Sequence, residues 1–348
     1  MDKGINRREA IGMAGAAALF GASPLAAQSS AELPFAAEAL TWLRHNAQPL
    51  DGYDPPIDSL RPLVQALEGS QLIGLGEATL GSHEDQTLKA AIAKALIAHG
   101  GVRVLAIEGN RRPAGMIDDY VRGGGPDPIA AIRDGGLPQA WQSEPFIGLI
   151  GWIRGWNLAG RPAVRIVGID VSSVGSDAWQ AWRFFQVVAP RHVATFEDAL
   201  APLVGTPAAR ERSVFELART LSQSQWNSAR QALDQIRNII VASNRPGSED
   251  AAGAALAARR SMDVARAAGS EGSANAGGAL RERMMADNLL EQAGRDRTML
   301  WSHNVKVLLG GDGIGAHLRR RLARNYRAVT FEAERGAVRV KPAGGALP

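Results

Sequence analysis

The chain has 348 residues, of which 45% are hydrophobic and 21% are charged, so it is long enough to bury a substantial core. Its formal net charge of +4 at pH 7 is a mild excess over a large surface, and we therefore expect neither nucleic acid nor a membrane as a partner. The absence of cysteine excludes disulfides, thiol catalysis and thiolate metal sites.

The N-terminus predicts an export signal over residues 1–27. Arg7 and Arg8 stand before an uncharged stretch that is rich in alanine, glycine and leucine, and small residues follow near Ala26 and Ala27. A basic start, a moderately apolar middle and a small-residue cleavage site are typical of a twin-arginine signal peptide.

The alternative for this segment is an amphipathic first helix, but no polar face is present between residues 11 and 25. The apolar stretch is also too short and too rich in glycine for a stable membrane span. We therefore expect a periplasmic or secreted protein that begins near Gln28 and has no membrane attachment after cleavage.

Short apolar runs without alternation predict buried parallel strands, and helical patterns follow most of them. Between the first two runs, Ser82 is expected to cap a helix with Asp85 at its third position, and Gly100 and Gly101 are expected to end it. The runs are Gln71–Gly76, Val102–Ile107, Val164–Ile169, Thr298–Ser302, Arg327–Phe331 and Val338–Lys341.

The alternation of strands and helices predicts an α/β fold with a mostly parallel central sheet that helices cover on both faces. From about residue 177 to 288 the pattern is helical only. We interpret this part as a helical lobe inserted before the last strands and able to cover an edge of the sheet. Because the sheet needs the strands on both sides of the lobe, residues 28–348 are expected to form one domain.

Each of the four inner strands ends in an acid or a histidine, namely Glu77, Glu108, Asp170 and His303 in chain order. The carboxyl ends of parallel strands lie along one edge of a sheet, where ligands usually bind. Crowded carboxylates raise the proton affinity of at least one of them, and a histidine can share a proton with a neighbour. The pattern therefore predicts a site for general acid–base chemistry.

Two other interpretations of these polar residues were weighed. Each residue could cap the helix after its strand or anchor a loop, but four such strand ends favour a shared site. The acids could also surround a metal together with His83 and His303, although no two histidines have close metal-ligand spacing. We expect no metal and no other cofactor.

Several segments, in this order and rough spacing, resemble the erythromycin esterase family. They are LIGLGEATLGSHEDQTLK, VRVLAIEGN, VRIVGID, RERMMADNL, MLWSHNVKV and YRAVTFEAERG, and they run from about Gln71 to the C-terminus. The resemblance implies an α/β protein with a helical lobe over a deep cleft. It also implies hydrolysis of the macrolactone ester of macrolide antibiotics, without a metal and with a histidine that activates water.

The resemblance assigns roles to individual residues. Catalytic positions fall on Glu77, Glu84, Glu108 and His303, and substrate-binding positions on Asp170, Arg281 and Asn304. Two positions depart from the family pattern. Leu80 stands where the water-activating histidine is expected, and Lys306 stands where relatives often have a second histidine.

Leucine cannot accept a proton, so the family mechanism cannot run unchanged. Three outcomes are open: His83 replaces the missing base, Glu77 or Glu108 replaces it, or the protein binds a small ligand or a metal without hydrolysis. Our first hypothesis is an exported hydrolase acting on a small-molecule ester or lactone. Glu77 and Glu108 would position water or share a proton, His303 would act as acid or orienting group, and Arg281 would stabilise negative charge. Neither the substrate nor the oligomeric state follows from the sequence.

Overall fold

The computed structural model describes residues 36–79, 82–125, 127, 129–130, 132, 137, 139–269 and 274–332. The predicted export signal, Leu80 and the predicted strand Val338–Lys341 lie outside the described residues.

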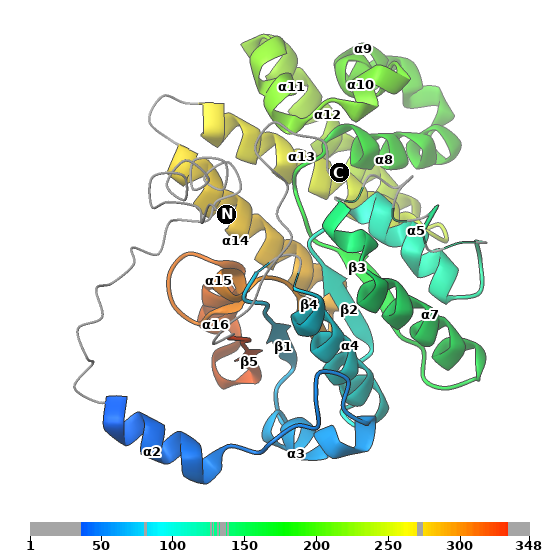
Figure 1. The fold of residues 1–348 in the computed structure, drawn as a ribbon. Helices are drawn as coiled ribbons and strands as arrows, with labels where there is room; N and C mark the ends of the chain where they lie inside the picture. Colours follow the sequence, from blue (N-terminus) through cyan, green and yellow to red (C-terminus); the bar gives the residue numbers. More distant parts are fainter. Residues whose placement is uncertain are drawn as a thin grey trace, which may run out of the picture.

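The centre of the molecule is a sheet of five parallel strands in the order β3-β2-β4-β1-β5 (Figure 1). The prediction of an α/β fold with a parallel sheet is confirmed. Four of the predicted apolar runs contain the observed strands, and the fifth strand begins one residue earlier than expected. The strands are β1 (Leu72–Leu75), β2 (Val104–Ile107), β3 (Arg165–Gly168), β4 (Thr298–Trp301) and β5 (Tyr326–Val329).

The strand register brings the carboxyl ends of the strands level with one another. Leu75 and Ile107 both pair with Trp301, and Gly168 pairs with Ile107. The residues that follow β1, β2, β3 and β4 therefore leave the sheet at the same edge, which is what a shared site requires.

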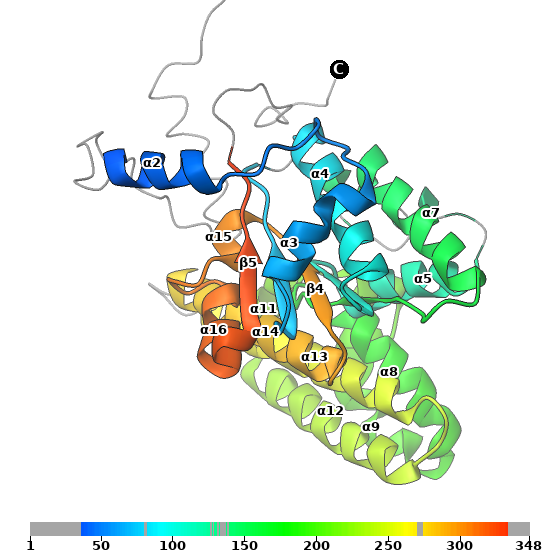
Figure 2. The same ribbon diagram turned by 90° about the horizontal axis from the view of Figure 1, so that it is seen from below.

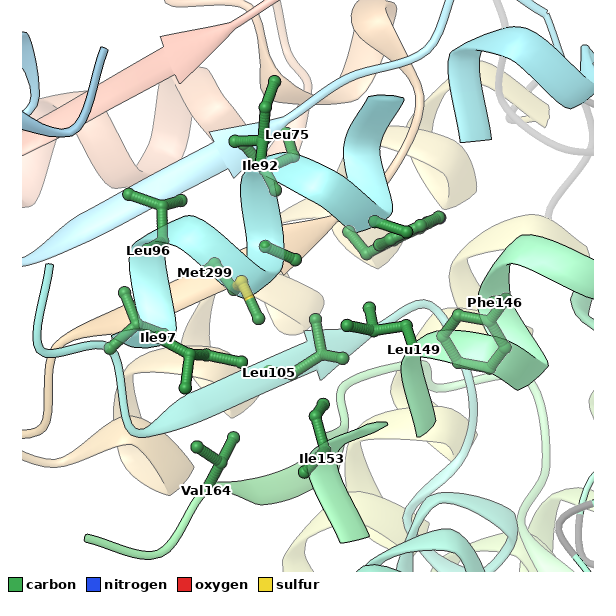
Figure 3. Close-up of a cluster of buried hydrophobic side chains, with 14 of the residues drawn as sticks. Leu75, Ile92, Leu96, Ile97, Leu105, Phe146, Leu149, Ile153, Val164 and Met299 are labelled. Atoms are coloured by element: carbon green, nitrogen blue, oxygen red, sulfur yellow. The ribbon is translucent and has the colours of Figure 1, made fainter. Parts of the chain in front are cut away.

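Both faces of the sheet are buried because side chains alternate between them along each strand. One face carries Ile73, Leu105 and Met299 and is covered by three helices, and Figure 3 shows part of this core with Phe146 and Leu149 packed against it. The helices are α4 (His83–Ala98), α5 (Arg111–Val121) and α7 (Glu144–Leu158).

The other face carries Leu72, Ala106 and Leu300 and is covered by α14 (Ala274–Ala293) and α16 (Ile314–Leu322). The short helix α15 (Asn304–Val307) follows β4 directly. Further elements are α2 (Ala36–Asn46), α3 (Arg61–Ala66) and four 3-10 turns at Ile57–Leu60, Gln139–Gln142, Pro190–His192 and Ala323–Asn325.

A group of helices lies between β3 and β4 in the chain (Figure 2). It has a hydrophobic core of its own, which includes Trp182, Phe185, Leu233, Ile236 and Met262. Serine caps begin two of these helices, with Ser213 and Ser222 each accepting a backbone hydrogen bond within the first turn. The helices are α8 (Gly175–Val188), α9 (Val193–Val204), α10 (Pro207–Glu211), α11 (Val214–Thr220), α12 (Gln223–Ser243) and α13 (Ser248–Gly269). We call α8 to α13 the lobe.

The helix α14 joins the lobe to the sheet. It packs on α13 at one side and contributes Met285, Ala286 and Leu289 to the core over the sheet at the other. Among the described helices, none has the length and apolar character needed to cross a membrane.

Candidate active site

Glu77, which follows β1, forms a buried ion pair with a lysine from α4. Its Oε2 lies 3.3 Å from the Nζ of Lys89, and both side chains are almost completely buried. Lys89 also donates to the carbonyl oxygen of Ser302 at 2.9 Å and lies 4.3 Å from the ring centroid of Trp301. Burial raises the pKa of Glu77 and lowers the pKa of Lys89 to about 8. The two proton affinities thus approach each other, and the pair can share a proton.

Glu108, which follows β2, is held in its ionised form. Burial alone would raise its pKa, but Lys306 and the hydroxyl of Ser302 together hold that pKa below its ordinary value. The Oε2 of Glu108 lies 2.9 Å from the Nζ of Lys306, and Ser302 Oγ donates to its Oε1. An ionised carboxylate with fixed partners can accept a hydrogen bond and a proton from water.

Glu282, which lies on α14, differs from Glu108 because its pKa is raised and not lowered. Its Oε1 accepts a hydrogen bond from Lys306 at 2.9 Å, whereas its Oε2 is buried and has no hydrogen-bond partner among the described residues. Burial raises the pKa of Glu282, although Lys306 acts against this increase. Lys306 therefore lies between an ionised carboxylate and a carboxyl group that holds a proton more readily, the arrangement from which an acid and a base can be assigned.

Asp170, which follows β3, is tied to Arg281 of α14. Arg281 donates from Nε at 2.9 Å, and its Nη2 lies 2.8 Å from the same Oδ1 of Asp170. Asp170 also accepts hydrogen bonds from the backbone of Val171 and from Ser172 Oγ. Burial would raise the pKa of Asp170, but Arg281 and these hydrogen bonds lower it, and Asp170 in turn raises the pKa of Arg281. The cation is therefore fixed in place at the sheet edge.

His303, which follows β4, caps the short helix α15. Its Nδ1 accepts a hydrogen bond from the backbone of Val305 at 3.3 Å, which places the proton of a neutral ring on Nε2. Burial lowers the pKa of His303, although Glu108 acts to raise it. The backbone of Ala78 also forms a hydrogen bond with the His303 ring. Because Nδ1 already accepts from Val305, Nε2–H is the one donor of the neutral ring, and it can polarise a substrate oxygen only by exchanging this backbone partner.

The turn between β1 and α4 is fixed by its own polar groups. Ser82 Oγ accepts a hydrogen bond from the backbone of Asp85 at 3.1 Å, which confirms the predicted N-cap. The carboxylate of Asp85 accepts from the backbone of Ala78 at 3.0 Å. His83 and Glu84 lie in the first turn of α4 with exposed side chains. Among the described residues, neither makes a hydrogen bond or ion pair with the acids above, so the structure does not bring them into the cluster.

Asn304 has a different environment from the one expected for a substrate-binding residue. Its Nδ2 donates to the carbonyl oxygen of Phe331 at 2.6 Å, and its Oδ1 accepts from the backbone of Phe331 at 3.1 Å. Gly76 leaves room for this amide, since a Cβ there would lie 2.1 Å from the Oδ1 of Asn304. The side chain therefore holds the segment after β5 against the end of β4.

The cluster at the sheet edge thus contains Glu77, Glu108, Asp170, Arg281 and His303, all of which the sequence singled out. Lys89, Glu282 and Ser302 were missed, and Lys306 was noticed only as a departure from a family pattern. We call these nine residues the charge cluster. Lys89 had a weak signal in the sequence, because it is one of two lysines, with Lys94, among the apolar residues of LKAAIAKALIA. Among the described residues, no three or more histidines or acids are placed to hold a metal ion.

The sequence model of the family described as erythromycin esterase matches residues 97–347. A curated relative, "Putative hydrolase YbfO" of Bacillus subtilis (strain 168), is 26% identical over 166 residues, which are 47% of this chain. The chain spans about a third of that relative's own length, with 34% covered.

Solved structures show a similar fold. A crystal structure of a Bacillus cereus protein has a TM-score of 0.73 at 19% identity, and a succinoglycan biosynthesis protein has a TM-score of 0.71 at 19% identity. Each match covers 84% of this chain and 74% of the other. A mutant of the erythromycin esterase EreC in its open conformation has a TM-score of 0.56 at 17% identity, with 81% and 74% covered.

Proposed function

This chain belongs to the erythromycin esterase family, and we propose that it hydrolyses a carboxylic ester or lactone of a small molecule by acid–base activation of water. The observation that carries the proposal is the pair of carboxyl groups on either side of Lys306. The pKa of Glu108 is lowered and that of Glu282 is raised, and on this difference we assign Glu108 as the proton acceptor and Glu282 as the proton donor.

In the proposed reaction, Glu108 accepts a proton from water as the water oxygen attacks the ester carbonyl carbon. The carbonyl oxygen becomes an oxyanion, which the guanidinium of Arg281 stabilises, together with the Nε2–H of His303 once this donor exchanges the backbone of Ala78 for the substrate oxygen. The carbon–oxygen bond to the alcohol then breaks, and Glu282 gives its proton to the departing alcohol. The proton taken up by Glu108 returns to Glu282 through the Lys306 ammonium that touches both carboxyl groups.

Glu77 and Lys89 support this reaction indirectly, through Ser302. Lys89 holds the carbonyl oxygen of Ser302, whose hydroxyl donates to Glu108, so the buried pair fixes the orientation of the proposed base. His83 is not assigned the role of the base, because its side chain is exposed and, within the described part of the chain, makes no hydrogen bond or ion pair with the charge cluster.

The proposal includes export. The paired Arg7 and Arg8, the apolar stretch after them and the small residues near position 27 favour a twin-arginine signal and a periplasmic or secreted location.

A second candidate function is the binding of a small ligand without hydrolysis. It is supported by Leu80, because a leucine at the position of the family's base removes a proton acceptor and makes the site more apolar. Native mass spectrometry of the purified protein, looking for a co-purified small molecule, is the measurement specific to this alternative.

A screen of ester and lactone substrates with the mature protein tests the first function. We expect acid release from at least one substrate, and a loss of about two to four powers of ten in kcat on Glu108→Gln, the size typical of removing a general base. Glu197→Gln, an exposed acid on α9, is the matched control and should keep full activity. If no substrate is turned over faster than by a Glu108→Gln/His303→Ala double variant, the hydrolase proposal is wrong.

A further inference from the structure

A second candidate site is a cavity of about 1030 Å³ along the outer edge of β3. None of the nine residues of the charge cluster lines it. Its floor includes Ile166, Val167 and Gly168, one wall is formed by α5, and the opposite wall by α8, α12 and α13 of the lobe with the end of α14. Figure 1 shows α5 and α8 beside β3. The volume is at the upper end of the range for small-molecule sites.

The floor of this cavity does not offer a free strand edge. Asp118 Oδ1 accepts a hydrogen bond from the backbone of Ile166 at 2.7 Å, and Gln292 Nε2 donates to the carbonyl oxygen of Gly168 at 2.7 Å. These side chains occupy backbone groups with which an added strand would pair. The cavity is therefore suited to side-chain recognition of a ligand and not to the addition of a peptide strand.

Six arginines and five acids line the cavity, and only some of the arginines have acidic partners. Arg111 pairs with Asp250, Arg122 with Asp118 and Arg165 with Asp296. Among the described residues, Arg112 on α5, Arg183 on α8 and Arg237 on α12 line the cavity without forming an ion pair. Of the acids in the lining, Glu291 pairs with Arg260, which leaves Asp119 and Glu249 without an ion pair. The unpaired cations thus outnumber the unpaired acids.

Two guanidinium groups in the walls have a buried donor without an acceptor. The Nε atoms of Arg111 and Arg237 are both buried, and neither has a hydrogen-bond partner among the described residues. The guanidinium of Arg111 packs closely against α13, because a Cβ on Gly253 would lie 2.8 Å from its Nη2. Leaving a buried N–H unpaired is unfavourable. Arg111 also interacts electrostatically with the buried carboxyl group of Asp177, so it is Arg237 whose unpaired N–H most needs an acceptor such as a ligand oxygen or water.

We propose that this cavity binds a small polyanion, a molecule with two or more carboxylate or phosphate groups. Guanidinium groups recognise both kinds of anion through paired N–H donors. Arg111 and Arg112 from α5 face the ligand from the wall nearest the sheet, and Arg183 and Arg237 face it from the lobe. Arg183 stacks beside Trp179, with its Cζ 5.6 Å from the ring centroid, which fixes the direction of its side chain. A bound polyanion therefore links the lobe to the sheet.

Isothermal titration of the full chain at constant ionic strength, with tripolyphosphate and citrate as probes, tests this site. We expect saturable binding of one molecule per chain, and at least a tenfold weaker affinity in Arg183→Gln/Arg237→Gln. The control Arg191→Gln/Arg324→Gln removes the same charge from two exposed arginines outside the cavity, and its affinity should change less than twofold. The tighter of the two probes identifies phosphate or carboxylate as the preferred group.

Three results would overturn the proposal. Neither probe binds saturably, or the cavity and control variants lose affinity for the probe equally. The third is loss of binding in Lys306→Gln, which would place the anion in the charge cluster. If Arg183→Gln/Arg237→Gln does not fold, the single variant Arg112→Gln decides, because this side chain is exposed. A threefold to tenfold weaker affinity is expected for it, and an unchanged affinity contradicts the proposal.

Discussion

Lys306 controls the protonation of the two carboxyl groups beside it. Its Nζ lies 2.9 Å from Glu108 Oε2 and 2.9 Å from Glu282 Oε1. Burial would lower the pKa of Lys306, but the two carboxyl groups raise it, so the ammonium stays charged. The same charge holds the pKa of Glu108 low, which keeps the proposed base ionised but also makes it a weak base.

Replacing Lys306 by glutamine should move the acidic limb of the pH–kcat profile to higher pH, by about one unit or more, if Glu108 is the base. Glu108 must be ionised to accept a proton, and its pKa rises when the neighbouring cation is removed. Activity at low pH should therefore decrease. Lys94→Gln, on α4 and without an ion pair among the described residues, should leave the limb in place. An unchanged limb in Lys306→Gln would mean that another group is the base.

Restoring a histidine at position 80 tests the effect of the departure from the family pattern. Because the pKa of Glu108 is held low, an imidazole near neutral pKa is the better general base, and Leu80→His should raise kcat by about two powers of ten or more. Leu80→Gln, which is polar but cannot act as a base, should give no such increase. The prediction fails if both variants behave like the parent protein.

At the scale of elements, the segment from the end of β4 to the start of α15 contains residues of the charge cluster and a residue that stabilises the fold. Ser302 donates its hydroxyl to Glu108 and His303 accepts from the backbone of Val305, whereas the amide of Asn304, the next residue, holds the backbone of Phe331. Neighbouring side chains thus have different roles because the chain turns from strand to helix within this segment.

Asn304→Ala should lower the free energy of unfolding by about 2–4 kcal/mol, because it removes two buried hydrogen bonds and leaves backbone groups of Phe331 unpaired. Urea unfolding measures this change, and Asn227→Ala, an exposed position on α12, should cost less than about 0.5 kcal/mol. An unchanged stability together with a raised KM would instead support the substrate-binding role expected from the family resemblance.

At the scale of the whole molecule, the seam between the lobe and the sheet contains a buried acid. Asp177, in the first turn of α8, is completely buried, and neither of its carboxyl oxygens has a hydrogen-bond partner among the described residues. Burial raises its pKa to about 7, while Arg111 acts against this increase. The seam therefore holds a carboxyl group that is neutral in mild acid and becomes charged near neutral pH.

A carboxyl group whose pKa is higher in the folded than in the unfolded protein stabilises the fold at low pH, and this stability is lost as pH rises toward the folded pKa. Asp177 should therefore make the protein less stable between about pH 4 and pH 7 as pH increases. Asp177→Asn should flatten this slope in thermal unfolding, and Asp198→Asn, an exposed acid on α9, should not change it. An unaltered slope in Asp177→Asn would show that the carboxyl group is not the source.

Much of the sheet could be predicted because its signals are local. The apolar runs located five strands to within one or two residues, and the cap at Ser82 followed from a serine and an acid three residues apart. The acids and the histidine at four strand ends followed from the geometry of parallel strands. The surroundings of His83, Glu84 and Asn304 could not be predicted in this way, because exposure and hydrogen-bond partners depend on how the turn and the last segment pack.

The sequence by itself determined that this is an α/β protein with a helical insertion and that Glu77, Glu108, Asp170 and His303 leave the sheet at one edge. These features depend on apolar periodicity and on residues adjacent in the chain. Only the tertiary structure decided which cation meets which acid, since Arg281 and Asp170 are 111 residues apart. The proton affinities follow from those contacts, because burial and neighbouring charges act through space and not along the chain.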